Sequence, residues 1–141
     1  MTTTGIGTRL RRALRARAER GAATLEIVIL FPVVLLITFG VIEGALWYHA
    51  RNIALAAAQE GAEVASAADS SLGAGAARAA EFAATAGSDG MLTNVSIGSS
   101  GGAEQVTITV SGNSLSLFPG WGGMRISQTA SAPVERFTTP G

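Results

Sequence analysis

The clearest pattern in the chain is one uninterrupted apolar run. Residues 27–42 (IVILFPVVLLITFGVI) contain no charged side chain, and extension to Leu46 gives twenty mostly apolar residues. A helix of twenty residues is long enough to cross about 30 Å of hydrocarbon. No polar stripe with a period of 3.6 residues interrupts the run, which disfavours an amphipathic surface helix and leaves a buried core helix as the alternative. The run therefore predicts a transmembrane helix over residues 22–48.

A single proline lies inside this run. Pro32 removes the backbone hydrogen bond to the Val28 carbonyl, so we expect the helix to bend there without ending. After the run, residues 50–68 (ARNIALAAAQEGAEVASAA) are strong helix formers with few large apolar side chains. The helix is therefore expected to continue out of the membrane.

Two glycines mark the next boundary. Gly73 and Gly75 interrupt the helical pattern, and residues 76–86 predict a second, shorter helix that ends near Gly87. Residues 49–87 are thus expected to form alanine-rich helices outside the membrane.

From Met91 the helical period gives way to alternation. Four short segments alternate apolar and polar residues, and they are separated by Gly, Ser and Asn, which favour turns. These segments are Asn94–Ile97, Gln105–Val110, Ser114–Leu117 and Arg125–Ala130. We expect residues 88–141 to form a small antiparallel β-sheet, which makes the chain an α+β protein.

The segment LFPGWGG carries two aromatic residues among its glycines, Phe118 and Trp121. We expect this loop to fold onto the sheet. An exposed adhesive tip is the alternative.

Charge is divided between the two ends of the chain. Residues 1–20 carry six arginines and one glutamate, whereas residues 22–141 carry four arginines and nine acidic residues. By the positive-inside rule, the arginines hold the amino end in the cytoplasm and place the carboxyl-terminal region outside. Residues 1–21 are therefore expected to be a cytoplasmic leader, with residues 1–20 disordered in solution. A nucleic-acid-binding arm is disfavoured, because the segment has no aromatic residues and adjoins an apolar run.

Small residues recur along the predicted helix. Gly40 and Gly44 form a GxxxG pair within the apolar run. The spacing of four continues in alanines at positions 50, 54, 58 and 62. In lipid such residues let two helices approach closely, so they predict a helix-packing face, with an ordinary alanine-rich helix as the alternative.

Polar and aromatic residues mark the outer end of the run. Glu43 lies about 25 Å along the helix from Glu26, at 1.5 Å per residue. It is either a functional acid within the membrane or a charge at the outer headgroups. Trp47, Tyr48 and His49 follow, where an aromatic belt is expected at the membrane interface.

The stretch RGAATLEI, residues 20–27, joins the leader to the run. A protease can approach an extended backbone closely at Gly21, which has no side chain. A cut between Gly21 and Ala22 would make Glu26 the fifth residue of the mature chain. The new Ala22 amine and Glu26 would then lie one turn apart on the same helix face. An acid at the membrane edge is costly unless it is paired, although Glu26 could also be an interfacial charge that reaches the headgroups.

This order of leader, glycine, glutamate and apolar run resembles the processing site of type IV pilins. In that family a prepilin peptidase, a membrane aspartic protease, removes the leader on the cytoplasmic side and leaves the helix in place. The resemblance implies that Glu26 pairs with the Ala22 amine of a neighbouring subunit, which aligns the helices in register.

The sequence from Ala23 to Glu63 is similar to the TadE-like domain of tight-adherence (Flp-type) pilus systems. The shared marks are the glutamate that opens the run, a proline six residues later, a glycine–acid pair near its end, and an acid–Gly–Ala triplet. In this chain they are Glu26, Pro32, the pair Glu43-Gly44, and Glu60-Gly61-Ala62. Family members often have arginine after the triplet, where this chain has Glu63, so a role tied to that arginine is not expected here.

The resemblance implies a minor pilin or pseudopilin, a structural or assembly subunit of a Tad/Flp pilus or secretion system, rather than the much shorter major pilin. Its implied partners are a prepilin peptidase, other pilin subunits, the Tad/Flp assembly machinery and the lipid bilayer. Its implied location is the cytoplasmic (inner) membrane, crossed once, with incorporation into a surface pilus as a further expectation.

No catalytic chemistry is predicted. The chain has no cysteine and one histidine, His49, and no nucleophile–base pair can be proposed. A lone imidazole is a poor basis for a metal site. We therefore expect no enzyme activity, metal, cofactor, small-molecule substrate or nucleic-acid partner.

Two other functions stay open. One is an uncleaved single-pass anchor that holds a small extracytoplasmic binding domain. The other is a secreted protein cut at an A-x-A site such as Ala54-Leu55-Ala56, although that site lies farther from the apolar run than is usual for signal peptidase.

Overall fold

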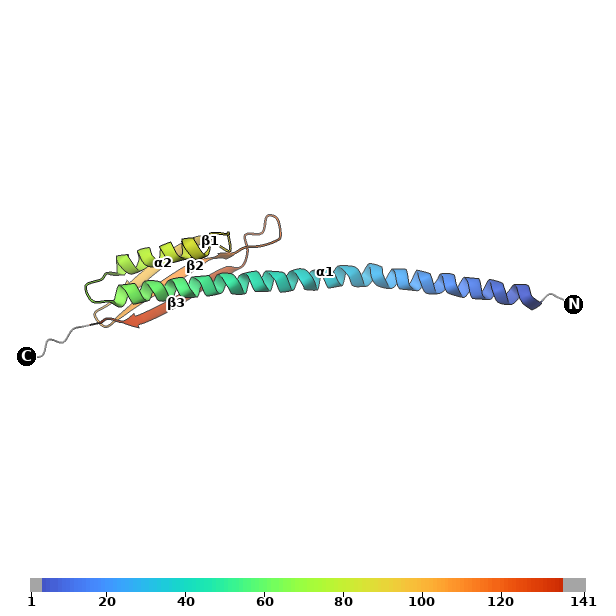
Figure 1. Cartoon of the computed structure of the whole chain (residues 1–141), viewed down its shortest axis with the longest axis horizontal. Coiled ribbons are helices and arrows are strands. Elements are labelled where there is room, and N and C mark those ends of the chain that lie inside the picture. The colour runs from blue at the N-terminus through green and yellow to red at the C-terminus, as the bar shows by residue number, and fades with distance from the viewer. Residues whose placement is uncertain (1–3, 136–141) are drawn as a thin grey trace, which may run out of the picture. The chain divides into compact units, whose positions relative to one another are not determined.

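The computed structural model describes residues 4–135, with the backbone only for residues 4–10, 13, 16, 18–20, 22 and 23. The elements in chain order are α1 (Thr4–Ser66), α2 (Leu72–Ala86), β1 (Leu92–Gly101), β2 (Gln105–Ser114) and β3 (Arg125–Pro133) (Figure 1). This order confirms the predicted α+β class, with a long first helix, a short second helix and then a small antiparallel sheet. By its internal contacts the chain divides into two compact units, residues 1–41 (unit 1) and residues 42–141 (unit 2).

Unit 1 contains the amino-terminal part of α1. The helix begins at Thr4, so the expectation of disorder over residues 1–20 is wrong for residues 4–20; the first three residues lie outside the described range. Alanine, leucine and arginine are strong helix formers. Nucleation is the costly step of helix formation, so a helix already present in the apolar run extends backwards through such residues at little cost. The helix also continues through Pro32, as predicted, whereas the bend there stays a prediction.

Unit 2 contains a sheet with the strand order β1-β2-β3, in which both pairings are antiparallel. The central strand β2 alternates strictly, with Val106, Ile108 and Val110 buried on one face. Its other face carries hydroxyls that pair with those of β3. The pairs are Thr107–Ser131 at 2.8 Å, Thr109–Thr129 at 3.0 Å and Ser111–Ser127 at 3.1 Å. One face of the sheet is therefore apolar and the other is lined with small polar groups.

One of the four predicted strand segments is not a strand. β2 ends at Ser114, whose backbone N–H donates to the Met124 carbonyl at 2.9 Å, and residues 115–117 belong to the connection to β3. Their alternation is short, and Pro119 follows without a backbone N–H for a ladder. The other three segments lie within β1, β2 and β3.

The second helix begins earlier than predicted, because Leu72 rather than residue 76 is its first residue. Ser71 caps it, and its Oγ accepts a hydrogen bond from the Ala74 N–H at 3.1 Å. Such a cap contributes about 1 kcal/mol, enough to offset a glycine in the first turn. The predicted end is confirmed, because Gly87 is the C-cap residue.

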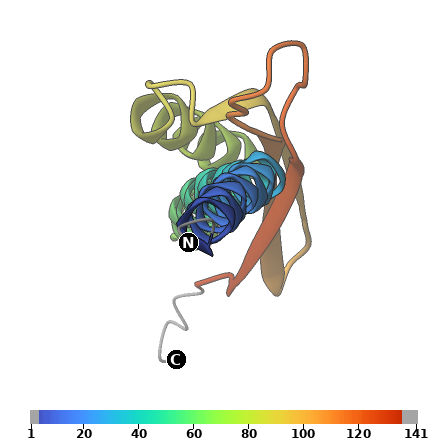
Figure 2. The same cartoon turned by 90° about the vertical axis from the view of Figure 1, so that its right-hand side faces the viewer.

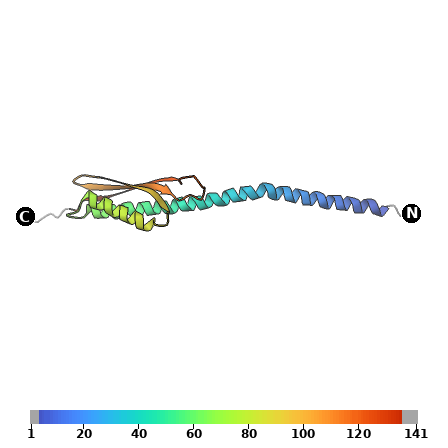
Figure 3. The same ribbon diagram turned by 90° about the horizontal axis from the view of Figure 1, so that it is seen from above.

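The helices of unit 2 cover the apolar face of the sheet (Figures 2 and 3). The alanine ridge of α1 faces inward. Its members Ala50, Ala54, Ala58 and Ala62 are buried in one cluster with residues of α2 and of the three strands. The predicted packing face between positions 50 and 62 is therefore used inside this chain.

The two helices of unit 2 meet at glycines. A Cβ on Gly61 of α1 would lie 2.7 Å from the Gly75 carbonyl oxygen of α2 and 2.8 Å from the Ala79 Cβ. Beside this crossing, Arg78 binds Glu60 at 3.1 Å, and that carboxylate raises the pKa of the Arg78 guanidinium. Both side chains are partly exposed and screened by solvent, so the pair contributes little to stability. The close backbone contact is what sets the distance between the helices.

Candidate functional site

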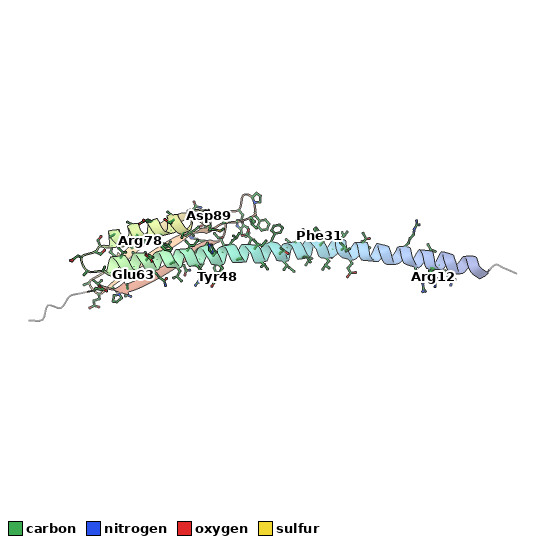
Figure 4. All side chains as sticks on the ribbon, viewed as in Figure 1. Arg12, Phe31, Tyr48, Glu63, Arg78 and Asp89 are labelled. Carbon is green, nitrogen blue, oxygen red and sulfur yellow. The ribbon has the colours of Figure 1, made fainter. Side chains whose placement is uncertain are left out.

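The apolar run presents its side chains to the surroundings. Every large apolar side chain from Leu25 to Val41 is exposed, and Figure 4 shows Phe31 standing out from α1. Among the described residues α1 is the one helix long and apolar enough to span a membrane, and none of its most apolar window is buried. Removing one such side chain from water contributes about 1.5–3 kcal/mol. The buried-core alternative therefore does not fit, and α1 is a candidate membrane span.

The predicted processing segment lies on the helix before this span. Gly21 and Ala22 are both helical, and Gly21 is exposed. A Cβ added at Gly21 would meet nothing within 4 Å in the described part of the chain. A protease that needs extended backbone must unwind the helix there, and glycine makes unwinding easier than alanine by about 1 kcal/mol. Gly21 is thus accessible, and it is the weakest helical position at the predicted cut.

Glu26 and Pro32, the two residues assigned to assembly and processing, also point outward. Both side chains are exposed. Within residues 4–135, the ion pairs that the structure gives are those of Arg78, and Glu26 takes part in neither. A partner for Glu26 would therefore have to come from outside the described residues.

The glycine pair of the span offers an open surface. Gly40 and Gly44 are exposed, and a Cβ at either would meet nothing within 4 Å of the described residues. Their role in packing against another helix stays a prediction, in contrast to the alanine ridge, which the chain covers itself.

Glu43 has hydrogen-bond partners within the chain, and the choice between a functional acid and a headgroup charge stays a prediction. Its side chain is only 7% exposed, and it belongs to unit 2. Oε1 accepts a hydrogen bond from the Leu117 backbone N–H at 2.7 Å and another from the Ser116 Oγ at 3.0 Å. The Ser116 Oγ in turn accepts from the Phe118 N–H at 3.1 Å. One carboxylate therefore orders three consecutive residues of the loop between β2 and β3.

Sequence reasoning missed this contact. Glu43 and Leu117 are 74 positions apart, and neither lies in a motif that points to the other. They come together only in the folded chain, where the sheet packs on α1 and the loop after β2 lies beside Glu43. The available signal was a single acid near the end of an apolar run, which pointed to Glu43 but not to its partner.

We expect Glu43→Ala to release the loop, because it removes the acceptor of the Leu117 N–H and of the Ser116 hydroxyl. Hydrogen bonds to a charged group contribute about 1.5–3 kcal/mol each. Hydrogen exchange of the full chain in detergent micelles should show lost protection at the Leu117 and Phe118 amides, with β2 still protected. Glu43→Gln keeps an acceptor and should restore part of the protection.

The matched control is Glu63→Ala, an exposed acid on the same helix. Such surface changes usually stay within about 0.5 kcal/mol. Equal protection of the Leu117 amide in the Glu43→Ala and Glu63→Ala variants would contradict the ordering role of Glu43.

Comparison with known proteins gives a match on α1, the helix that carries the candidate residues from Gly21 to Gly44. Residues 21–63 match the model of a family described as TadE-like protein. The chain carries a TadE-like segment. This match confirms the resemblance found in the sequence. No curated protein and no solved structure matches the chain significantly.

The TadE-like segment begins at Gly21 and ends at Glu63, so it includes every candidate site residue predicted above. Its closing triplet has a visible structural role, because Glu60 binds Arg78 and Gly61 touches Gly75. Glu63, the last residue of the matched segment, is exposed on α1 (Figure 4). The segment thus supplies both the candidate span and the helix on which the sheet packs.

Together, the TadE-like segment and the exposed apolar helix support a pilin-like protein associated with a Tad pilus system. They also fit a membrane-anchored protein. A structural rather than enzymatic role agrees with this family.

Proposed function

We propose that this protein is a minor pilin or pseudopilin of a Tad/Flp-type pilus or secretion system, cut by a prepilin peptidase between Gly21 and Ala22. The observation that carries the proposal is the order of features within the TadE-like segment. Gly21 opens the matched segment, Glu26 lies one turn beyond Ala22, and the exposed apolar helix follows directly. An ordinary membrane anchor needs none of these marks in that order.

Glu26 is proposed to set the register of the subunits. In the membrane an unpaired acid at a helix centre costs roughly 2.5–3.5 kcal/mol on insertion scales, and a positive partner removes much of that penalty. Cleavage creates such a partner, the Ala22 amine, on every subunit. Glu26 is exposed, and no described residue pairs with it, which leaves it available to the amine of a neighbour.

The proposed layout follows from the charge asymmetry. Residues 1–21 are the cytoplasmic leader and residues 22–48 the single span of the inner membrane. Residues 49–87 are the extracytoplasmic helices, and residues 88–141 are the β region, of which the last six lie outside the described range. The partners are a prepilin peptidase, other pilin subunits, the assembly machinery and the lipid bilayer. Incorporation into a surface pilus is the final step of this proposal.

The test is the amino terminus of the membrane-bound product, from cells that contain a Tad prepilin peptidase. We expect mature protein to begin at Ala22. Gly21→Trp should leave the leader attached, because the bulky side chain keeps the backbone away from the protease. Amino-terminal sequencing and intact mass give the answer directly.

The matched control is Gly7→Trp, the same change within the leader, which should be processed normally. Mature-length protein from Gly21→Trp would show that the cut lies elsewhere. An intact Met1 in the unaltered chain would leave the uncleaved anchor as the function. A start near Ala57 would instead identify a secreted protein, although such a cut would remove Ala50 and Ile53 from the core.

A further inference from the structure

The loop between β2 and β3 exposes large apolar side chains. Leu117, Phe118 and Trp121 are 46%, 41% and 57% exposed, which fits an exposed tip better than the expected loop folded onto the sheet. The two rings instead lie beside each other, with centroids 6.0 Å apart and planes tilted by 49°. Burying them on the sheet is prevented because the helices already cover its apolar face.

The loop is held in this form by hydrogen bonds. At its far end the Asn113 Nδ2 donates to the Gly122 carbonyl at 2.9 Å, and the Met124 N–H donates to the Ser114 Oγ at 3.0 Å. The Trp121 N–H closes a turn on the Phe118 carbonyl at 3.2 Å. With the Glu43 bonds at its near end, the loop displays its apolar side chains on a fixed backbone.

The position of the loop within unit 2 is informative. Glu43, its binding partner, is the second residue of this unit, and the apolar run precedes it directly in the chain. At the opposite end of the unit the Glu135 N–H donates to the Ser66 carbonyl and the Val134 N–H to the Glu104 carbonyl, and both glutamates are exposed. Glu43 and Ser66 are about 35 Å apart along the helix. Exposed aromatic residues are thus placed where the span ends, and acidic residues at the far end.

We propose that the loop Leu117–Trp121 inserts its apolar side chains into the interface of the lipid bilayer, on the side where the span emerges. This inference rests on the membrane anchoring contained in the proposed function. Tryptophan and other aromatic side chains prefer the membrane interface, where one edge is apolar and the other hydrated. The irregular backbone of the loop restricts insertion to that depth, because unpaired peptide groups are costly in hydrocarbon.

Two further observations favour lipid over a protein partner. Trp47, expected from the sequence to stand in the aromatic belt, packs partly against the core of unit 2, whereas Tyr48 is exposed beside it on α1 (Figure 4). The loop adds two exposed aromatic residues to this end of the unit. Three side chains are also too small a patch for a stable protein interface, which buries about 800 Å² on each partner.

The test uses depth-dependent quenching of the full chain in phosphatidylcholine vesicles. Trp47→Phe leaves Trp121 as the sole tryptophan. Phosphatidylcholine with bromine near the headgroup end of its acyl chains should then quench most of the Trp121 fluorescence. The Trp121 emission should also be blue-shifted. Bromine near the terminal methyl groups of the acyl chains should quench the Trp121 fluorescence far less.

The matched control moves the reporter to the far end of the unit. Gly102→Trp in a Trp47→Phe, Trp121→Phe background uses a position where a Cβ would meet nothing within 4 Å of the described residues, and it should not be quenched. Protein that floats with the vesicles while Trp121 stays unquenched would overturn the loop proposal and leave the anchoring intact. Protein that fails to float at all would overturn the anchoring, and the loop proposal with it.

Discussion

Gly61→Leu should destabilise unit 2 more than any other single change considered for it. The new Cβ alone would lie 2.7 Å from the Gly75 carbonyl oxygen, 2.8 Å from the Ala79 Cβ and 3.2 Å from the Ile108 Cγ2. Backbone cannot move aside as a flexible side chain does, so the helices must separate. Overpacking of this kind costs typically 1–3 kcal/mol and sometimes more, and four added carbons place Gly61→Leu at about 3 kcal/mol or above. A domain of this size has only about 5–15 kcal/mol in total.

The measurement is the melting temperature of the full chain in detergent micelles, followed by near-ultraviolet circular dichroism. A loss of 3 kcal/mol lowers Tm by roughly 10–20 °C in a domain of about 100 residues. Gly73→Leu is the matched control. It lies in the first turn of α2, where a Cβ would approach only the Ser71 Oγ, at 3.7 Å, and it should stay within about 0.5 kcal/mol of the original chain. Equal melting of both variants would show that the crossing is not close-packed in solution.

The crossing also gives a physical reason for one mark of the TadE-like segment. The triplet Glu60-Gly61-Ala62 looks like a plain sequence pattern, yet Gly61 sets the helix distance and Ala62 is buried beside it. The family match ends at residue 63, and Gly75 lies beyond it. The sequence therefore pointed to Gly61, the glycine of this helix contact that lies in the TadE-like segment. It did not indicate that Gly75 is its partner.

Local patterns predicted what local forces decide. The apolar run, the end of α2 at Gly87 and the alternation of β2 all follow from side chains within a few positions of one another. The leader was misjudged because its charge was weighed above the helix propensity of its alanines, leucine and arginines. The start of α2 was misjudged because the Ser71 cap was overlooked.

Long-range contacts were beyond the sequence for a different reason. The Glu43 bonds to the loop join positions 73 and 74 residues apart, and Gly61 meets Gly75 only after the chain turns back. The pattern of small residues in a sequence does not indicate which residues they will contact. A hydrogen bond from a backbone N–H requires no particular residue type at the donor. Such contacts depend on the topology, which one sequence leaves open.

Glu26→Ala should insert, be cut after Gly21, and then fail to enter filaments. Removing the acid should not hinder insertion, since an acid costs roughly 2.5–3.5 kcal/mol at the centre of a membrane helix and Glu26 lies nearer its edge. It also removes the proposed partner of the neighbour's Ala22 amine. Two opposite charges 4 Å apart attract by about 4 kcal/mol at an effective dielectric constant of 20, and the contact recurs at every subunit. The ratio of sheared filament to membrane-bound protein should therefore fall sharply, with the mature amino terminus unchanged.

Two companion variants separate charge from size and from general loss of an acid. Glu26→Gln keeps the shape but not the charge, so it should assemble as poorly as Glu26→Ala. Glu63→Ala removes an exposed acid of the same helix and should assemble normally. If Glu26→Gln entered filaments as well as the original chain, a hydrogen bond rather than an ion pair would hold the register. If Glu26→Ala did so too, the exposed acid would be only an interfacial charge, and the helices would have to be aligned by the open face at Gly40 and Gly44.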